Sequence, residues 1–346
     1  MGARNALSCW RRMALGLMTF ALWEGILMLV PLPPLFSQAA VIEIRAHHDA
    51  TTASPWHLGM VRFAELVEKK SNGNLKVKIF PPGQLSQGNM RTTVELLQAG
   101  SIHCALFVPG YYEVFDERFM VFGMPFIFEN REQTYRVLDG PLGEKMLALI
   151  SEKGIKAMAY WDHGYRQITN SKRPIRMPED LRGLKIRTPP SPVVESIFKT
   201  LGTTTTATAL GELYMALQQR MVDGEENPYN SIYRRKFYEV QKYITEWNYQ
   251  FAPLFVGTNL AFFKTLSPDH QGILISAAKE AAPYQRKVSA DEDDLMKKEL
   301  VAKGMELTLL TKEQMNAFKK AMDPVYKEFE PKIGRELLKE FMGALK

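Results

Sequence analysis

The segment between residues 41 and 108 alternates strands with helices. Strands are predicted at 41–46, 75–80 and 102–108, because these runs are apolar or alternate polar with apolar residues. Helices are predicted between them at 56–70 and 89–99, where apolar residues recur at helical spacing. Parallel strands need a long crossover between them, and a helix supplies one. This order therefore predicts a parallel sheet covered by helices.

The rest of the chain continues to mix helices with strands. The predicted elements are a helix over 131–153, a strand over 155–161, a strand over 252–263, helices over 267–282 and 283–303, a strand over 305–310, and a terminal helix that starts at the capping box Thr311–Gln314 and is divided by Pro331 and Gly334. The pattern as a whole predicts an α/β fold.

Turn density changes at residues 162–170, where a polar sequence follows a predicted strand. We predict that a second domain begins there. The first domain is expected to comprise 41–163 and 253–291, and the second 164–252 and 292–346. Because no long linker appears at these crossings, we expect them to form a hinge rather than a tether.

Composition excludes some classes of protein. The chain has 346 residues, of which 46% are hydrophobic and 24% charged, and its formal net charge is +6. These values are ordinary for a globular protein long enough for two domains. The basic residues are mixed with acidic ones and form no cluster, so we expect no nucleic-acid partner. A monomer is the default expectation.

The first 39 residues have the layout of a secretory signal peptide. Three arginines precede a nearly apolar run over 13–30, and small residues follow at 37–40, which predicts cleavage after Ala39 or Ala40. An uncleaved membrane anchor is the alternative, because the apolar run is long. Removal of the signal would leave Cys104 as the one cysteine, so no intrachain disulfide is expected.

The residues around Arg187 favour an anion. Residues 184–187 alternate as a short strand, and two prolines end the strand directly after Thr188. Ser191 and Pro192 then have the form of an N-cap followed by proline at the first helical position. An arginine at a strand end and a helix N-terminus therefore lie a few residues apart. Both attract anions, and a guanidinium matches a carboxylate with two parallel hydrogen bonds.

Four ordered motifs carry a resemblance to a known family. They are Gly-Leu-Lys-Ile-Arg-Thr-Pro at 183–189, Gly-Glu-Leu-Tyr-Met-Ala-Leu-Gln-Gln at 211–219, Val-Asp-Gly-Glu-Glu-Asn-Pro at 222–228 and Lys-Phe-Tyr-Glu-Val-Gln-Lys-Tyr at 236–243. With them the chain resembles the solute-binding proteins of tripartite ATP-independent periplasmic (TRAP) transporters, of the C4-dicarboxylate-binding type. The resemblance implies a two-domain α/β periplasmic protein with a ligand cleft and a hinge.

The resemblance also implies ligand contacts. Arg187 is expected to form the main salt bridge to a ligand carboxylate, Arg166 to assist it, and Asn227 to line the pocket. Two alternatives remain open from the residues alone. Arg166 could pair with a structural carboxylate, and Asn227 could only shape the turn before Pro228.

The first domain is expected to supply the opposite wall of the cleft. The candidate contacts there are His48, Asp49 and Asn89, and Tyr214 of the second domain is a further candidate. The sialic-acid-binding branch of the family has an asparagine in the first loop, whereas this chain has His48 and Asp49. This difference argues against sialic acid as the ligand. The resemblance implies a small organic acid, such as a dicarboxylate, a sugar acid or a related carboxylate.

Motifs for catalysis, nucleotides and metals are missing from the sequence. It contains no nucleophile elbow, phosphate-binding loop or zinc-protease helix. The sequence His47-His48-Asp49 with His57 is interpreted as a polar loop rather than a zinc site, because adjacent histidines on a strand end point in different directions. We therefore expect no enzyme activity, no cofactor and no metal.

Three hypotheses follow. The first is a periplasmic solute-binding protein that delivers an organic acid to the membrane permease of a TRAP transporter. The second is an exported enzyme acting on carboxylates, for which Glu225 and Glu226 are the nearby candidate groups. The third is a binding protein that presents its bound state to a signalling receptor.

Overall fold

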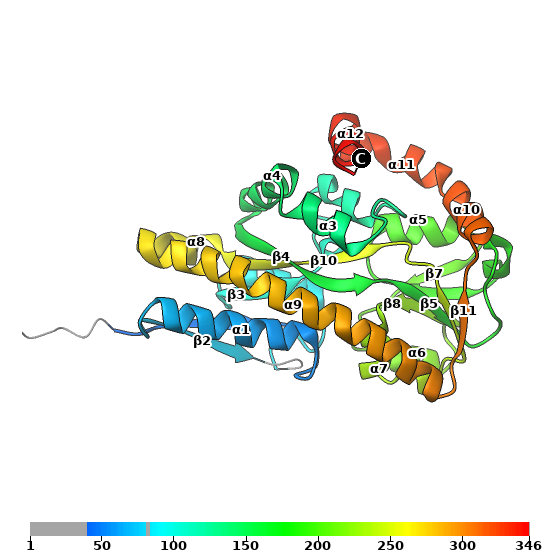
Figure 1. The fold of residues 1–346 in the computed structure, drawn as a ribbon, viewed down its shortest axis with the longest axis horizontal. Coiled ribbons are helices and arrows are strands. Elements are labelled where there is room, and N and C mark those ends of the chain that lie inside the picture. The colour runs from blue at the N-terminus through cyan, green and yellow to red at the C-terminus, as the bar shows by residue number, and fades with distance from the viewer. Residues whose placement is uncertain (1–39, 81–83, 346) are drawn as a thin grey trace, which may run out of the picture. The chain divides into compact units, whose positions relative to one another are not determined.

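The computed structural model of the protein describes residues 40–80 and 84–345 (Figure 1). The predicted signal peptide at 1–39 lies outside the described residues. Within the described part of the chain, no helix is both long enough and apolar enough to cross a membrane.

The first of two sheets has the strand order β2-β1-β3-β10-β4. Its strands are β1 (Ile42–His47), β2 (Leu75–Phe80), β3 (Cys104–Phe107), β4 (Ile155–Tyr165) and β10 (Phe251–Asn259). Strands β1, β2 and β3 are parallel and are joined through α1 (Pro55–Lys70) and α2 (Met90–Gln98), which confirms the predicted crossover helices. Strand β10 then pairs antiparallel with both β3 and β4, so the sheet is mixed.

The second sheet has the strand order β11-β9-β5-β8-β6-β7. Its strands are β5 (Gln167–Asn170), β6 (Lys185–Thr188), β7 (Thr204–Ala207), β8 (Gly224–Asn227), β9 (Tyr243–Glu246) and β11 (Glu306–Leu309). The accompanying helices are α5 (Pro192–Thr200), α6 (Leu213–Gln218) and α7 (Tyr229–Arg234). Helix α5 begins as predicted, because Ser191 is its N-cap and Pro192 occupies its first turn.

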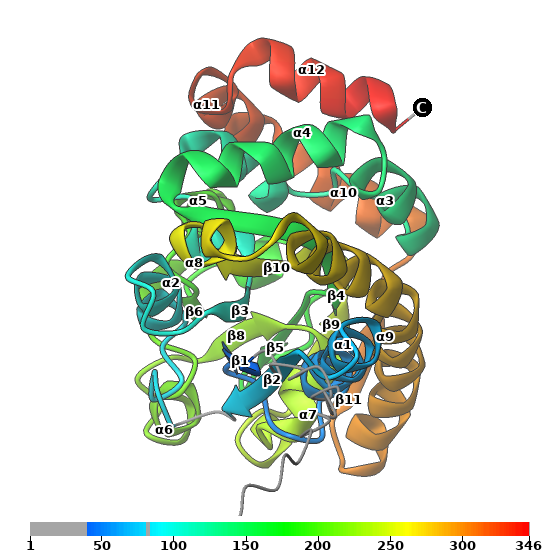
Figure 2. The same cartoon turned by 90° about the vertical axis from the view of Figure 1, so that its left-hand side faces the viewer.

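Three segments connect the two sheets. Strand β4 passes through Arg166 directly into β5, and β9 is followed closely by β10. The third segment is α9 (Pro268–Ala302), which packs on α1 and β4 and also on α7 (Figures 1 and 2). The predicted domain boundaries at 163/164, 252/253 and 291/292 fall on β4, β10 and α9, and they remain a prediction.

Two helix predictions were wrong. The expected helix over 131–153 is two helices, α3 (Arg131–Leu138) and α4 (Pro141–Ile150). A Cβ atom on Gly143 would lie 1.8 Å from the Leu138 carbonyl oxygen, so glycine permits the close approach at this corner. Conversely, the two helices expected over 267–303 are the single helix α9. Helix α9 tolerates Pro283 because this residue is exposed. Proline has no N–H to donate to the carbonyl one turn earlier, and water can bond that carbonyl instead.

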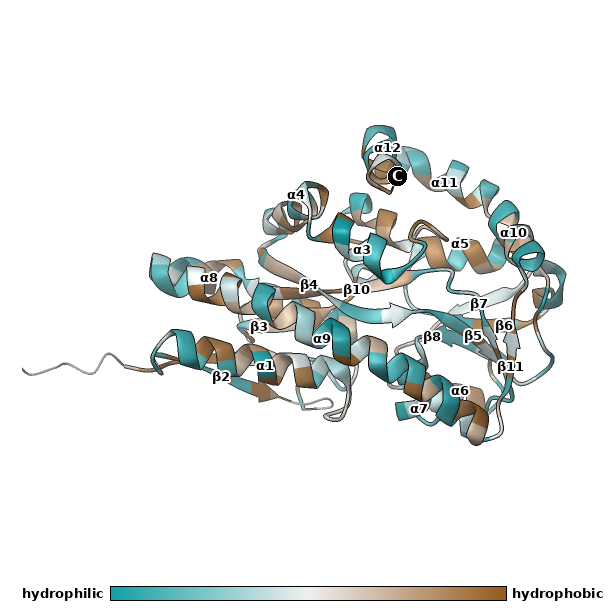
Figure 3. Ribbon diagram, in the orientation of Figure 1, coloured by the Kyte–Doolittle hydropathy of each residue, from teal (hydrophilic) through white to brown (hydrophobic). Residues whose placement is uncertain are grey.

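The remaining elements differ less from expectation. The strand predicted over 252–263 ends at Asn259 and is followed by the short helix α8 (Leu260–Thr265), while the terminal region forms α10 (Lys312–Ala321), α11 (Asp323–Ile333) and α12 (Arg335–Ala344). The capping box at Thr311 and Gln314 is confirmed. Figure 3 shows apolar residues along β3 and β10, and their side chains belong to the main buried core.

Candidate functional site

A cavity lies where the two sheets and their connecting strands meet. Its empty volume is about 640 Å³, open solvent at the mouth included. The lining residues come from the first sheet and its helices (Asp49, Trp56, Gly88, Met90, Val108, Pro109, Gly110 and Tyr111), from the connecting strands (His163, Arg166, Gln250 and Ala252) and from the second sheet and its helices (Arg187, Pro189, Ser191, Val194, Leu210 and Asn227). Four of the predicted ligand contacts line it: Arg187, Arg166, Asn227 and Asp49.

Arg187 is a buried cation on the cavity wall. It lies on β6 with 1% of its surface exposed. Its Nε and Nη2 donate to the Thr208 carbonyl oxygen at 2.9 and 2.5 Å. Within residues 40–80 and 84–345 it forms no ion pair. Both hydrogen bonds orient the guanidinium, but a neutral carbonyl does not balance its charge, so this site favours an anion.

The N-terminus of α5 adjoins Arg187. Ser191 caps this helix by accepting a hydrogen bond from the Val194 amide at 3.4 Å, and both residues line the cavity. The N-terminus of α5 and the guanidinium of Arg187 therefore line the same cavity, and both attract negative charge. Gln250 adds a buried acceptor, because no hydrogen-bond partner is found for its Oε1 among the described residues.

Arg166 has a partner within the protein. It forms a buried ion pair with Glu226, and its Nη2 also donates to the Glu226 carbonyl oxygen at 2.7 Å. The Tyr249 hydroxyl donates to the same carboxylate at 2.7 Å. Pairing with a structural carboxylate, which the sequence left open as an alternative, is therefore present. Arg166 lines the cavity as part of a neutral pair.

Asn227 joins the same network. It lies at the end of β8, and its side-chain oxygen accepts from Arg166 at 3.3 Å while its nitrogen donates to Glu225 at 2.5 Å. Burial raises the pKa of Glu225 to about 7, although the charge of Arg187 opposes this shift. Hydrogen bonds within the protein therefore hold the carboxyl groups of both Glu225 and Glu226 in place.

On the opposite wall, Asp49 is held rigidly. Its carboxylate accepts from Ser86 and, at 2.7 Å, from Thr93, and His47 lies 3.3 Å away. Burial raises the pKa of Asp49, but the hydrogen bonds from His47, Ser86 and Thr93 outweigh burial and the pKa lies below its ordinary value. The carboxylate is therefore ionised, and these three residues hold it in place.

The other three predicted contacts lie outside the cavity lining. His48 Nε2 is 3.0 Å from His57 Nδ1. Asn89 is exposed and caps α2 by accepting from the Arg91 amide at 3.0 Å. The Tyr214 hydroxyl donates to Glu239 at 2.7 Å. Each of these side chains has a local structural partner.

Sequence reasoning missed Trp56 and His163, which both line the cavity. Trp56 Nε1 donates to His163 Nδ1 at 3.1 Å. An indole can only donate, so Nδ1 of His163 accepts and the neutral ring carries its proton on Nε2. Burial lowers the pKa of His163 far below its ordinary value, and Arg166 and Arg235 lower it further. No local motif marks this pair, because the two residues are 107 positions apart.

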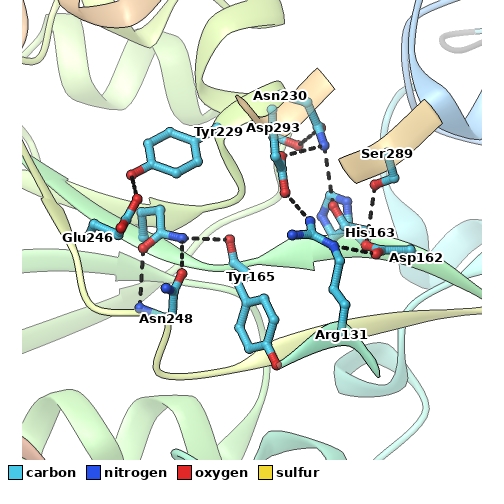
Figure 4. Close-up of polar contacts among 12 residues, drawn as sticks. Arg131, Asp162, His163, Tyr165, Tyr229, Asn230, Glu246, Asn248, Ser289 and Asp293 are labelled. Atoms are coloured by element: carbon cyan, nitrogen blue, oxygen red, sulfur yellow. Dashed lines mark hydrogen bonds and ion pairs between the residues drawn. The ribbon is translucent and has the colours of Figure 1, made fainter. Parts of the chain in front are cut away.

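A polar network supports His163 from behind (Figure 4). Asn230 of α7 donates to the His163 carbonyl oxygen at 3.3 Å and to Asp293 of α9 at 3.4 Å. Arg131 of α3 bridges Asp293 and Asp162, donating to the latter at 2.8 Å. Three helices therefore hold the end of β4 at the point where it leaves the first sheet. No group of three or more His, Cys, Asp or Glu side chains in the described ranges could hold a metal ion.

Comparisons with known proteins agree on one family. The model of bacterial extracellular solute-binding protein family 7 matches residues 46–332. The 2,3-diketo-L-gulonate-binding periplasmic protein of Escherichia coli is 33% identical over 256 residues, covering 74% of this chain and 77% of its own.

Two solved structures are similar throughout the fold. The sugar acid binding protein of Advenella mimigardefordensis in complex with galactonate has a TM-score of 0.85 and 32% identity, covering 88% of this chain and 98% of its own. The TRAP periplasmic solute-binding protein of Sulfurospirillum deleyianum with bound succinate has a TM-score of 0.83 and 33% identity, covering 89% and 100%.

Proposed function

Because the chain belongs to bacterial extracellular solute-binding protein family 7, we propose that it is the extracytoplasmic solute-binding subunit of a TRAP transporter. In this proposal it captures a small organic acid in the cavity between the two sheets and delivers it to the membrane permease. The similar proteins bound to galactonate and succinate support an acidic ligand.

The observation that carries the proposal is the buried, unpaired Arg187. Its Nε and Nη2 are oriented by the Thr208 carbonyl, and no acidic side chain of the described residues lies within ion-pair distance. A ligand carboxylate would balance this charge and accept further hydrogen bonds from the same guanidinium. The α5 N-terminus would add to the attraction.

The remaining candidate contacts have supporting roles in this proposal. Arg166 and Asn227 form a pre-organised polar wall, because Glu226 and Glu225 already fix their positions. Asp49 is ionised, so it favours ligand hydroxyl groups, which can donate to it, over a second carboxylate at that point. Closure of the two sheets about β4 and β10 would then bury the ligand and create a surface for the permease.

The proposal is tested by calorimetric titration and thermal shift of the exported protein with organic acids and sugar acids. A ligand at a hundred times its dissociation constant is expected to add about 2.7 kcal/mol to the free energy of unfolding. In Arg187→Ala the affinity should fall about 30-fold or more, since breaking a buried ion pair costs about 2–5 kcal/mol. The control is Arg62→Ala, because Arg62 is an exposed arginine on α1.

Two results would oppose the proposal. Unchanged affinity in Arg187→Ala would remove Arg187 as the anchor. Turnover of a bound acid by the purified protein would favour the exported-enzyme hypothesis instead.

A further inference from the structure

Glu113 lies directly behind the wall of the cavity. It follows the short 3-10 helix η1 (Pro109–Tyr111), and 1% of its surface is exposed. Its Oε2 accepts a hydrogen bond from the Ser191 hydroxyl at 2.7 Å, and Ser191 lines the cavity. A Cβ atom on Gly110, another lining residue, would lie 3.5 Å from the Ser191 Cβ and 4.0 Å from Glu113 Oε1. The carboxyl group is therefore separated from the cavity by a single layer of residues, at the N-terminus of α5.

The surroundings of this carboxyl group favour its protonated form. Oε1 has no hydrogen-bond partner among the described residues. The space beside it is apolar, since a Cβ atom on Gly123 would lie 3.1 Å from both Oε1 and the Val193 Cβ. An ionised carboxylate here would keep one hydrogen bond and have no counter-charge, which is costly for a buried group. Burial accordingly raises the pKa of Glu113 to about 8, and the hydrogen bond from Ser191 offsets only part of this shift.

The charged groups on the elements packed around Glu113 have other surroundings. Helix η1 packs against α2 and β10, and η2 (Glu117–Gly123) packs against β10, α5 and α11. Strand β10 carries no charged residue. On and beside the other elements the paired groups are Asp116 with Arg118, Arg118 with Glu152, Arg91 with Glu95, Glu195 with Lys199, Glu330 with Arg335 and Glu328 with Ser196, while Glu117, Asp323, Lys327 and Lys332 are exposed. Among the described residues, Ser191 is therefore the side chain through which Glu113 can act on the cavity.

The Ser191 hydroxyl has one hydrogen, and Glu113 decides where it can go. The hydroxyl oxygen accepts from the Val194 amide at 3.4 Å. An ionised Glu113 can only accept, so it takes the hydroxyl hydrogen of Ser191. A protonated Glu113 can instead donate to the hydroxyl oxygen, which frees that hydrogen for an acceptor in the cavity. Protonation also removes a negative charge that would offset the positive N-terminus of α5.

Resting on the proposed function, we infer that Glu113 is a positioning residue for ligand binding: in its protonated form it sets the Ser191 hydroxyl to donate to the bound anion. Glu113 itself does not touch the ligand. Binding of the anion and protonation of Glu113 then favour one another, because each stabilises the same arrangement of Ser191. The protein therefore takes up a proton when it binds its acid, and its affinity falls as the pH rises through the range in which Glu113 ionises.

The test is calorimetric titration of the exported protein with galactonate and succinate between about pH 7 and about pH 9.5, where both acids are ionised. The affinity of the wild type is expected to fall about 10-fold over this range, the lower end for a hydrogen bond to a charged group. Titrations in buffers with different ionisation enthalpies, repeated near pH 8.5, should show uptake of about half a proton per ligand bound. A purely structural role of Glu113 would produce no such uptake.

Four variants assign the proton. Glu113→Gln is neutral at every pH and offers both a donor and an acceptor, so its affinity should stay flat and its proton uptake should vanish. Ser191→Ala should also abolish the uptake, whereas Ser191→Thr keeps the hydroxyl and should retain it. Glu225→Gln is the matched control, because Glu225 is the other acid at this site with a raised pKa, about 7, and its removal should leave the uptake near pH 8.5 in place.

The possible failures are distinguishable. The same pH dependence in wild type and Glu113→Gln, or no proton uptake by the wild type, would overturn the role of Glu113 and leave the proposed function intact. A changed melting temperature of Glu113→Gln with an unchanged pH profile would likewise reduce Glu113 to a structural residue. If the wild type binds no organic acid at about pH 7, or if Arg187→Ala binds with full affinity, the proposed function itself fails. Melting temperatures of all variants show whether each one folds.

Discussion

The guanidinium of Arg187 donates two hydrogen bonds to the backbone carbonyl of Thr208, and this carbonyl is its only hydrogen-bond partner among the described residues. Arg166, in the same cavity lining, has its charge balanced by Glu226. Both arginines carry a positive charge, but only the charge of Arg166 is balanced by an acidic side chain of the described residues. Arg166 has a structural counter-ion, whereas Arg187 is held in position and can pair with a bound anion.

The Arg166–Glu226 ion pair is expected to contribute mainly to the stability of the folded protein. Glu226→Gln would leave the buried Arg166 without its counter-charge and should lower the free energy of unfolding by about 3–5 kcal/mol. Urea denaturation measures this loss. The double variant Arg166→Met/Glu226→Leu is the control, because replacing both partners with apolar residues is often close to neutral. A loss below about 1 kcal/mol in Glu226→Gln would contradict this assignment.

Glu113 is expected to make stability depend on pH. It is buried, Ser191 donates to its Oε2 at 2.7 Å, and burial raises its pKa from 4.5 to about 8. The folded state binds this proton more tightly than the unfolded state does. Protonated Glu113 therefore makes its full contribution to the free energy of unfolding below about pH 4.5, and this contribution is lost as the pH rises to about 8. Glu113→Gln keeps an acceptor for Ser191 but removes the titration.

The unfolding free energy of the wild type should therefore fall relative to Glu113→Gln across this interval, by up to about 5 kcal/mol. Denaturant titrations at several pH values measure the difference. Parallel curves for the two proteins would show that Glu113 does not titrate in this range.

Asn89 is expected to stabilise a helix rather than bind the ligand. Asn89→Ala should lower the free energy of unfolding by about 1 kcal/mol, the usual cost of losing an N-cap, and should leave ligand affinity unchanged. Ser191→Ala is the matched comparison, because Ser191 is also an N-cap but lines the cavity. It should affect both stability and affinity. Loss of ligand affinity in Asn89→Ala would instead support Asn89 as a ligand contact, as the sequence predicted.

The sequence by itself determined the α/β class, the crossovers of the first sheet and the position of Arg187 between a strand end and the α5 N-terminus. These features depend on local rules: alternation in strands, helical spacing of apolar residues, and the Ser-Pro start of a helix. The family resemblance added Arg166 and Asn227, which also line the cavity.

Only the tertiary structure decided which charges are balanced. Glu226 lies 60 residues from Arg166, Trp56 lies 107 residues from His163, and the Asp49 carbonyl lies 186 residues from Arg235. The interruption between α3 and α4 and the continuity of α9 through Pro283 likewise depend on packing and solvent exposure. Pairing and burial join residues that are distant along the chain, so no local pattern can specify them.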